Sequence, residues 1–298
     1  MVFVALVASA GAAQPPFRSA IELVRLTVTV TLPGGGHLAN LTAADFVVEE
    51  DGRKQAVTVF SADRQPFSVA FLVDVSASMR GNAFRDARSA VEVFIRQHFG
   101  VADEALVCVF STAVTCADRW SRDAGLLAAA LAPVEPRGAT RLLDAIPPVL
   151  QLFSGARHRK QVLVVLSDGQ DVSSTQSAQQ VSALLRERQV LLYAVAFPSG
   201  EAPLAPPRWG RWRAEPVNLT LLRGLTTPTG GMTFYAESSA QIEEAVRKMA
   251  LELQHQYLLG YPVPAGPVGI REVSVRLKDK SKASVRARGA YVVASRED

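Results

Sequence analysis

The sequence is poor in the residues that build zinc sites, with two cysteines and four histidines among 298 residues. None of them form a cluster with zinc-site spacing, which argues against a zinc-binding domain. The chain also lacks the patterns GxGxxG and GxxxxGK[ST], so we expect neither dinucleotide binding nor a phosphate-binding loop of that type. No apolar stretch reaches the roughly 20 residues that cross a bilayer, so no transmembrane span is expected.

The two cysteines, Cys108 and Cys116, lie on two β-like runs joined by a short loop. A three-residue loop would place them opposite each other, whereas a two-residue loop would offset them by one residue. The sequence therefore leaves open whether they form a disulfide or remain two small buried thiols in a sheet.

The excess of positive charge is small, because 32 Lys and Arg face 28 Asp and Glu, a net charge of +4. The basic residues are spread along the chain, whereas nucleic-acid-binding proteins usually gather them on one face. We therefore expect no nucleic-acid partner. The shares of hydrophobic residues (48%) and charged residues (20%) are typical of a globular protein. The length fits one large domain and a smaller one.

The N-terminal residues resemble a targeting segment. Val2–Ala10 is a short apolar run, and the small residues that follow it predict a signal-peptidase site near Ala13. We therefore expect an exported protein that is periplasmic, secreted or at the cell surface. No Lys or Arg precedes the run, and a buried N-terminal strand is the alternative interpretation.

The pattern of apolar residues changes twice along the chain. Alternation from Ile21 to Leu32 predicts a half-buried strand, and Asp51-Gly52 predicts a hairpin turn within residues 46–60. From Pro66 to about residue 252, buried strands alternate with helices, which predicts βαβ units and a mostly parallel sheet with helices on both faces. After Tyr257 the β pattern returns.

These patterns predict an α/β fold, a doubly wound, mostly parallel Rossmann-like sheet flanked by a small β-sandwich. Neither terminal β segment is large enough to bury a core alone, so we expect the two to pair. Two separate β extensions packed on the α/β domain are the alternative. The predicted division is a signal-like segment and linker at 1–17, an N-terminal β segment at 18–65, the α/β domain at 66–252 and a C-terminal β segment at 253–298.

Oxygen-bearing side chains follow two of the predicted buried strands. Asp74, Ser76 and Ser78 come after the strand that ends at Val73, and Asp168 lies in a Ser-Asp-Gly turn directly after the strand that ends at Leu166. Thr140 lies in a loop before a predicted helix. Because ligands bind at the carboxyl ends of parallel strands, we expect the three loops to converge if the two strands are neighbours.

The residue types suit a hard cation, Mg²⁺ or alternatively Mn²⁺ or Ca²⁺, since all the ligands are oxygens. Only two carboxylates would surround the dication, so the site stays electrophilic and an incoming carboxylate can complete its shell.

The pattern Asp74-x-Ser76-x-Ser78, then Thr140, then Asp168 resembles the metal-ion-dependent adhesion site of von Willebrand factor A domains. The resemblance covers about residues 66–252. It implies that the first Asp and both Ser begin the site, that Thr140 and Asp168 bind directly or through water, and that an acidic residue on a partner protein reaches the metal. The flanks LTAADFVVEEDGR and YLLGYP resemble a bacterial, acidobacteria-like subgroup of A-domain proteins.

Other function classes are less well supported by the residues. Ser76 does not lie in a GxSxG elbow, and no His in a loop at that edge offers a base, so we expect no enzyme. A structural cell-envelope scaffold without metal dependence is the alternative to a binding module.

The segment 198–216 is rich in proline and is expected to form an extended loop at the same sheet edge. Its Trp209 and Trp212 are of a type enriched at binding hot spots, so they are candidate partner-binding residues. A mobile surface loop with its tryptophans folded onto the domain is the alternative.

Overall fold

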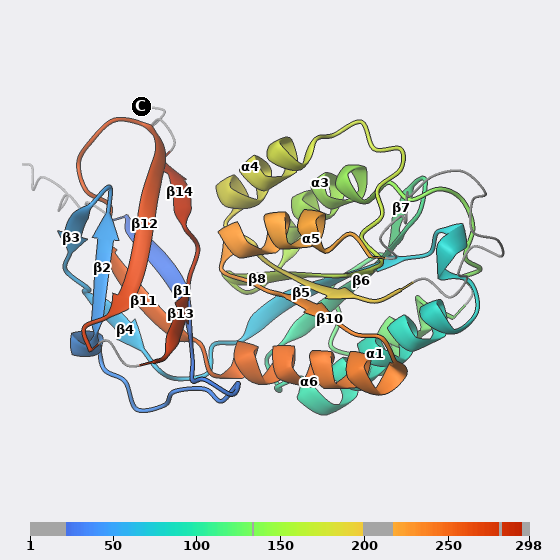
Figure 1. Cartoon of the computed structure of the whole chain (residues 1–298), viewed down its shortest axis with the longest axis horizontal. Coiled ribbons are helices and arrows are strands. Elements are labelled where there is room, and N and C mark those ends of the chain that lie inside the picture. The colour runs from blue at the N-terminus through green and yellow to red at the C-terminus, as the bar shows by residue number, and fades with distance from the viewer. Residues whose placement is uncertain (1–21, 133, 199–216, 280–281, 294–298) are drawn as a thin grey trace, which may run out of the picture.

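The protein consists of an α/β domain and a β-sandwich that lie side by side (Figure 1). The structure is a computed structural model that describes residues 22–132, 134–198, 217–279 and 282–293. The predicted signal-like run and the proline-rich segment with Trp209 and Trp212 lie outside the described residues. Among the described residues, no helix is long and apolar enough to cross a membrane.

The α/β domain is built on a six-stranded sheet in the order β10-β9-β8-β5-β6-β7. Five strands run parallel, and only the edge strand β7 pairs antiparallel with its neighbour. Their bounds are β5 (Phe67–Asp74), β6 (Glu104–Phe110), β7 (Val114–Cys116), β8 (Lys160–Ser167), β9 (Leu191–Ala196) and β10 (Thr233–Tyr235). The strands β5 and β8, which carry the two predicted aspartates, are direct neighbours.

Helices cover both faces of this sheet, as predicted. The continuous apolar run of β5 serves both layers, because Val69 and Phe71 belong to one buried cluster and Ala70 and Leu72 to the other. One layer comprises α1 (Asn82–His98), α2 (Ala124–Ala129) and α6 (Ser239–Gln254), and the other α3 (Leu142–Leu152), α4 (Ala178–Arg188) and α5 (Leu219–Thr226). Short 3₁₀ turns lie at Ala43–Asp45, Ala77–Met79, Phe153–Gly155 and Thr227–Thr229.

The β-sandwich contains two four-stranded sheets, β13-β1-β11-β4 and β14-β12-β2-β3. Each sheet combines strands from both ends of the chain, and their apolar faces share one core. The strands are β1 (Leu23–Thr31), β2 (Phe46–Glu50), β3 (Arg53–Gln55), β4 (Val59–Ser61), β11 (Tyr257–Pro262), β12 (Gly269–Leu277), β13 (Ser284–Arg286) and β14 (Ala290–Val293). The terminal segments therefore pair into one sandwich, and they are not two separate extensions.

The predicted hairpin within residues 46–60 forms only in part. Its turn lies at Asp51-Gly52, as expected, but the second strand ends at Gln55. The chain then crosses to the other sheet, where β4 pairs with β11. Within residues 53–60, Val57 and Phe60 pack against the sandwich core, whereas β3 contributes no apolar side chain to it.

The disulfide that the sequence left open is present. The loop between β6 and β7 has three residues, so Cys108 lies opposite Cys116 and the two are bonded. The bond fastens the antiparallel edge strand β7 to the sheet.

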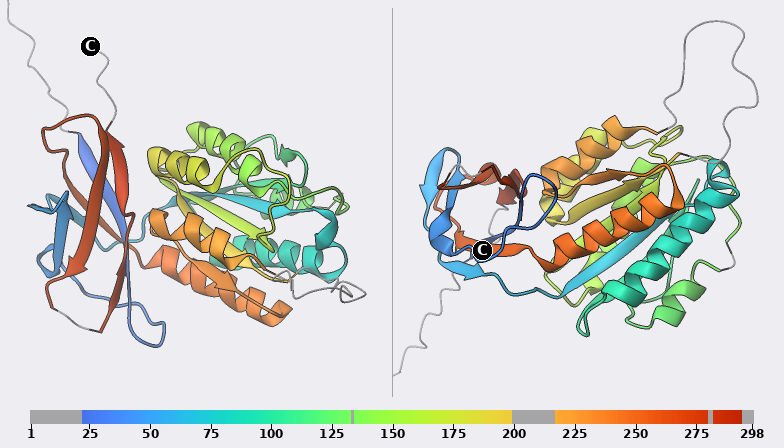
Figure 2. Two further views of the ribbon diagram at one scale, coloured as in Figure 1. Left: turned by 45° about the horizontal axis from the view of Figure 1, so that its top comes forward. Right: turned by 60° about the horizontal axis from the view of Figure 1, so that its bottom comes forward.

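The sandwich packs against the amino ends of the parallel strands. The chain enters the α/β domain between β4 and β5 and returns through α6, which Figure 2 shows leading directly into the sandwich. The buried carboxylate of Glu252 on α6 joins the two parts, since it accepts hydrogen bonds from Thr29 Oγ1 (3.2 Å), from Tyr193 and from Arg286. The opposite, carboxyl edge of the sheet therefore faces away from the sandwich.

Candidate metal centre

The predicted ligands all lie at the carboxyl edge of the parallel sheet. Asp74 is the last residue of β5, and Asp168 follows the last residue of β8. Ser76 and Ser78 lie in the loop after β5, with their hydroxyl oxygens 3.0 Å apart. Thr140 lies in the loop before α3. Four of the five are buried although they are polar, namely Asp74 (0% exposed), Ser76 (1%), Asp168 (1%) and Thr140 (4%).

Hydrogen bonds join the three loops in a closed circuit. The first and second loops are linked from Arg137 N to Val75 O (2.7 Å) and from Ala77 N to Gly138 O (2.9 Å). The second and third are linked from Val172 N to Thr140 O (3.2 Å). The circuit closes where the Ser167 hydroxyl donates to Asp74 Oδ2 at 2.6 Å. The predicted convergence of the loops thus rests on three backbone hydrogen bonds and one hydrogen bond between side chains.

The carboxylate of Asp74 is held in place on both oxygens. Ser76 N donates to Oδ1 at 2.8 Å, while Ser167 donates to Oδ2. Burial, and to a smaller extent the charge of Asp168, raise the pKa of Asp74 to about 6 against the opposing effect of these hydrogen bonds. The site therefore brings two buried carboxyl groups into electrostatic contact, an arrangement that is unfavourable unless a cation or a proton offsets it.

Asp168 is positioned by the tight turn that follows it. Its Oδ1 accepts from Gln170 N (2.9 Å), and its carbonyl accepts from Asn218 N (2.9 Å) ahead of α5. Gly169 has a φ of +73°, and a Cβ there would come within 3.0 Å of the Asn218 carbonyl oxygen. Glycine is thus required at this position on two counts.

The donor set fits a hard divalent cation. Two buried carboxylates and three hydroxyls present oxygen atoms only, which Mg²⁺, Mn²⁺ and Ca²⁺ prefer over nitrogen or sulfur. No group of three or more His, Cys, Asp or Glu side chains suited to a metal occurs among the described residues, so the hydroxyls are essential to such a site. With two carboxylates, a bound dication would remain open to a further anionic ligand.

Three other residues support the loops, and the sequence reading gave them no role. Ser167 donates to Asp74 and accepts from Gly169 N at 3.0 Å. Asp144 on α3 accepts from the backbone of Thr175 at 3.0 Å, and Asp171 accepts from Leu143 N at 2.9 Å, so the third loop is fastened to α3. The Ser-Asp-Gly turn was a signal for Ser167, whereas the two aspartates act through contacts that only the tertiary structure shows.

All four histidines lie away from this edge. His98 ends α1 and accepts at its carbonyl from α6, while His158 precedes β8 at the amino edge. His37 and His255 stack on each other, with ring centroids 5.2 Å apart, where the sandwich meets α6. No imidazole is therefore placed to act as a base beside Ser76.

A parallel sheet with helices on both faces and a polar three-loop site at its carboxyl edge defines a class of ligand-binding α/β domains. Residues 69–170 match the family model of the von Willebrand factor type A domain. This part of the chain, residues 69–170, is therefore assigned to the von Willebrand factor type A domain.

Solved structures share this fold at low sequence identity. A von Willebrand factor type A protein from Catenulispora acidiphila is 13% identical with a TM-score of 0.53, over 86% of this chain and 74% of that one. An aerotolerance-related membrane protein from Bacteroides fragilis is 15% identical with a TM-score of 0.51, over 63% of this chain and 98% of that one. The conserved hypothetical protein BatB from Bacteroides thetaiotaomicron is 14% identical with a TM-score of 0.50, over 62% and 98%. None of the curated proteins compared with the chain matches it.

The family resemblance is thus confirmed at the level of the domain and its fold. The narrower likeness to an acidobacterial subgroup and the predicted domain boundaries stay predictions, as do the roles of the metal ligands.

Proposed function

We propose that the protein is an exported, divalent-cation-dependent protein-binding module. In this proposal Asp74, Ser76, Ser78, Thr140 and Asp168 hold Mg²⁺, or Mn²⁺ or Ca²⁺, at the carboxyl edge. A carboxylate on a partner protein then completes the shell of the metal. The observation that carries the proposal is the closed circuit of three loops, which gathers two buried carboxyl groups and three hydroxyls on an edge that the sandwich leaves uncovered.

The charge of the site supports an acidic partner. Two carboxylates neutralise a dication but fill only part of its coordination shell, so a partner carboxylate can complete the shell and leave the site with only a single net negative charge. When a partner carboxylate displaces a water molecule from the metal, binding of the partner becomes dependent on the bound metal. The buried position of Asp74 strengthens this effect, because electrostatic attraction is weakly screened there.

Export is the second part of the proposal. The apolar run Val2–Ala10 is typical of a signal segment, and the Cys108–Cys116 disulfide suits an oxidising compartment. A disulfide is rare in a reducing cytosol, so it supports the periplasm, the exterior or the cell surface.

Calorimetric titration with Mg²⁺ and Mn²⁺ tests the metal site. We expect saturable binding by the natural chain and its loss in Asp74→Ala and in Asp168→Ala. The matched control is Asp118→Ala, which removes an exposed carboxylate elsewhere in the domain. Pull-down from the native cell envelope with Mg²⁺ and then with EDTA tests the partner. A protein that folds normally but binds no divalent cation would instead be a structural scaffold of the cell envelope.

Catalysis is not part of the proposal.

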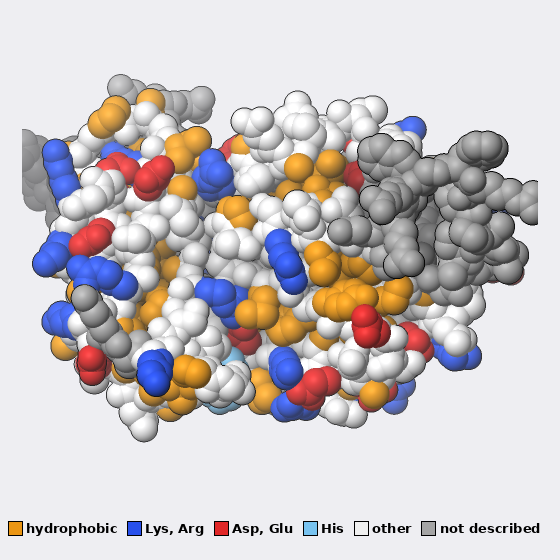
Figure 3. Space-filling view, in the orientation of Figure 1, with side chains coloured by type: hydrophobic (Ala, Val, Ile, Leu, Met, Phe, Trp, Pro, Cys, Tyr) orange, Lys and Arg blue, Asp and Glu red, His pale blue; other side chains and the backbone are white. Residues whose placement is uncertain are grey.

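Nucleic-acid binding is not part of it either. Acidic and basic side chains are mixed over both parts of the visible face (Figure 3), which gives no support for a nucleic-acid surface.

A further inference from the structure

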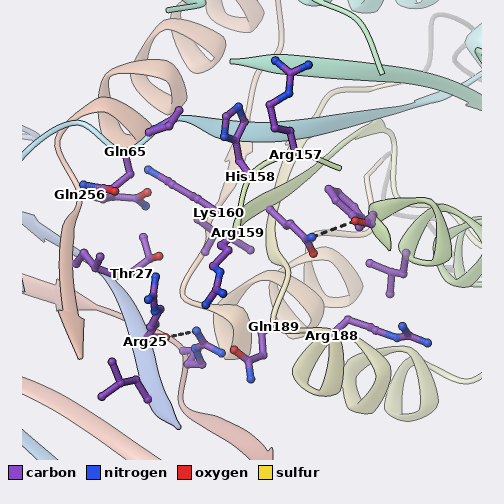
Figure 4. A pocket seen from close by; sticks show the side chains of 18 of the residues that line it. Arg25, Thr27, Gln65, Arg157, His158, Arg159, Lys160, Arg188, Gln189 and Gln256 are labelled. Carbon is purple, nitrogen blue, oxygen red and sulfur yellow. Dashed lines mark hydrogen bonds between the residues drawn. The ribbon is translucent and has the colours of Figure 1, made fainter. Parts of the chain in front are cut away.

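A second site lies at the opposite edge of the sheet, in a cleft between the α/β domain and the sandwich (Figure 4). Its volume is about 710 Å³, within the range of small-molecule sites. Both parts of the chain line it. The basic lining residues are Arg25, Arg157, Arg159, Lys160, Arg188 and Arg288, against a single acidic one, Glu187.

These basic side chains form no ion pair with a carboxylate in the described part of the chain. The other two enclosed arginines of the sandwich differ in this respect, since Arg271 pairs with Glu50 and Arg286 pairs with Glu252. The charges of Arg271 and Arg286 are thus neutralised by carboxylates within the fold. The basic side chains of the cleft have no carboxylate at ion-pair distance in the described part of the chain, and of the buried ones Lys160 is influenced by the more distant carboxylates of Asp103 and Glu252.

Two arginines from opposite sides face each other across the cleft. Figure 4 shows the side chains of Arg25, on β1, and Arg159, just before β8, extending toward one another, whereas Arg157 and Arg188 extend away. Arg288 lies beside Arg25 and donates a hydrogen bond to its carbonyl oxygen. The cleft therefore gathers guanidinium groups from both parts of the chain.

Burial acts on two of the basic side chains that line the cleft. Burial lowers the pKa of Arg288 to about 10, and its Nη1 atom is enclosed with no acceptor among the described residues. Burial, and secondarily the charge of Arg64, lowers the pKa of Lys160 to about 7. A bound anion would stabilise the charged form of both groups.

We propose that this cleft binds a small organic anion with two or more phosphate or carboxylate groups, held by Arg25 and Arg159 from opposite sides. A guanidinium presents paired N–H donors that match both kinds of oxyanion. Arg288 supplies positive charge behind them, and the apolar side chains of Leu150, Phe153 and Leu258 offer a surface for the body of the ligand. The proposal is independent of the metal site, because the cleft lies at the amino ends of β5, β8 and β9.

Binding of inorganic pyrophosphate and of citrate to the full chain tests this site. Calorimetry is run in buffer freed of divalent cations by a chelating resin, with sodium chloride of equal ionic strength as the reference. We expect saturable binding of at least one probe, and affinity reduced about tenfold or more in Arg25→Gln and Arg159→Gln. Arg53→Gln removes the same charge from the exposed strand β3 and should retain the affinity of the natural chain, as should Asp74→Ala. Binding of pyrophosphate alone would assign a phosphate ligand, and binding of citrate alone a carboxylate ligand.

Thermal unfolding separates a ligand site from a structural role. Without a probe, Arg159→Gln should be about as stable as the natural chain, because Arg159 is exposed and forms no ion pair with a carboxylate in the described part of the chain. With a probe, only chains that retain both arginines should gain stability. The proposal is overturned if neither probe binds saturably, or if both arginine variants bind as tightly as the Arg53 control.

Discussion

Replacing Asp74 by Asn should stabilise the metal-free protein while it abolishes metal binding. The carboxyl group is fully buried, and burial raises its pKa from the ordinary value of 3.8 to about 6. An Asn side chain keeps an acceptor for Ser76 N and introduces no charge into this site. The substitution therefore tests whether the charge of Asp74 destabilises the metal-free fold and is needed only for metal binding.

The size of this stabilisation follows from the ordinary pKa of an Asp side chain and the pKa of Asp74 in the folded protein. They differ by about 2, and each unit is worth about 1.4 kcal/mol, so ionised Asp74 destabilises the metal-free fold by about 3 kcal/mol. The folded-state pKa is raised, so the penalty is absent below pH 3.8, grows up to about pH 6 and is fully present at pH 7. Ser167 must turn its hydroxyl away from the new amide, which offsets part of the gain. We expect a net stabilisation of about 1 to 3 kcal/mol.

Urea denaturation in EDTA at pH 7 and at about pH 4 measures this difference. The gain of Asp74→Asn should be present at pH 7 and largely lost at about pH 4. Added Mg²⁺ should stabilise the natural chain, by about 2.7 kcal/mol at a hundredfold excess over Kd, and leave the variant unchanged. The reasoning is refuted if the variant is less stable than the natural chain at pH 7 in EDTA, or if Mg²⁺ stabilises both equally.

Three further outcomes are expected. Thr140→Ala should weaken partner affinity more than Mg²⁺ affinity, as the family resemblance implies, and equal losses in the two titrations would contradict it. Glu252→Ala should lower the free energy of unfolding by about 3 to 5 kcal/mol, because it leaves Arg286 without its carboxylate, whereas exposed Glu243→Ala should change it by less than about 0.5 kcal/mol in the same urea experiment. Replacing Trp209 and Trp212 by Ala should reduce partner affinity and leave Mg²⁺ affinity unchanged; unaltered partner binding would remove the proline-rich segment from recognition.

Local sequence signals predicted the α/β domain well because its strands and helices differ in period. The run from Phe67 to Val73 is apolar throughout, and the structure shows why, since alternate residues pack on the two helical layers. In the sandwich, apolar and polar residues do not alternate along β11. The reason is that Leu259, Gly260 and Tyr261 are buried in succession between β1 and β4. A Cβ at Gly260 would come within 2.9 Å of Val59, so the close packing of β11 on β4 requires glycine at this position.

The two candidate sites differ in how far the sequence could predict them. Asp74 and Asp168 each follow an apolar run, so their residue types and their place at a sheet edge could be read locally. The basic cleft has no such signal, because Arg25, Arg159 and Arg288 are distant in sequence and meet only where the sandwich packs on the α/β domain. A cluster that is assembled by domain packing requires the tertiary structure.

The separation of the two sites sets a limit on how they can influence each other. The strand β8 runs from Lys160 in the cleft to Ser167 beside Asp74, a rise of roughly 23 Å at about 3.3 Å per residue. This distance exceeds the Debye length of about 8 Å at physiological ionic strength, so charge bound at one site is largely screened from the other. The anion affinity, calculated from the concentration of probe that is not chelated by Mg²⁺, should therefore be the same with and without Mg²⁺. A coupling free energy above about 1 kcal/mol would mean that the strands or the sandwich shift as a body when one site fills, because direct electrostatic interaction cannot supply it.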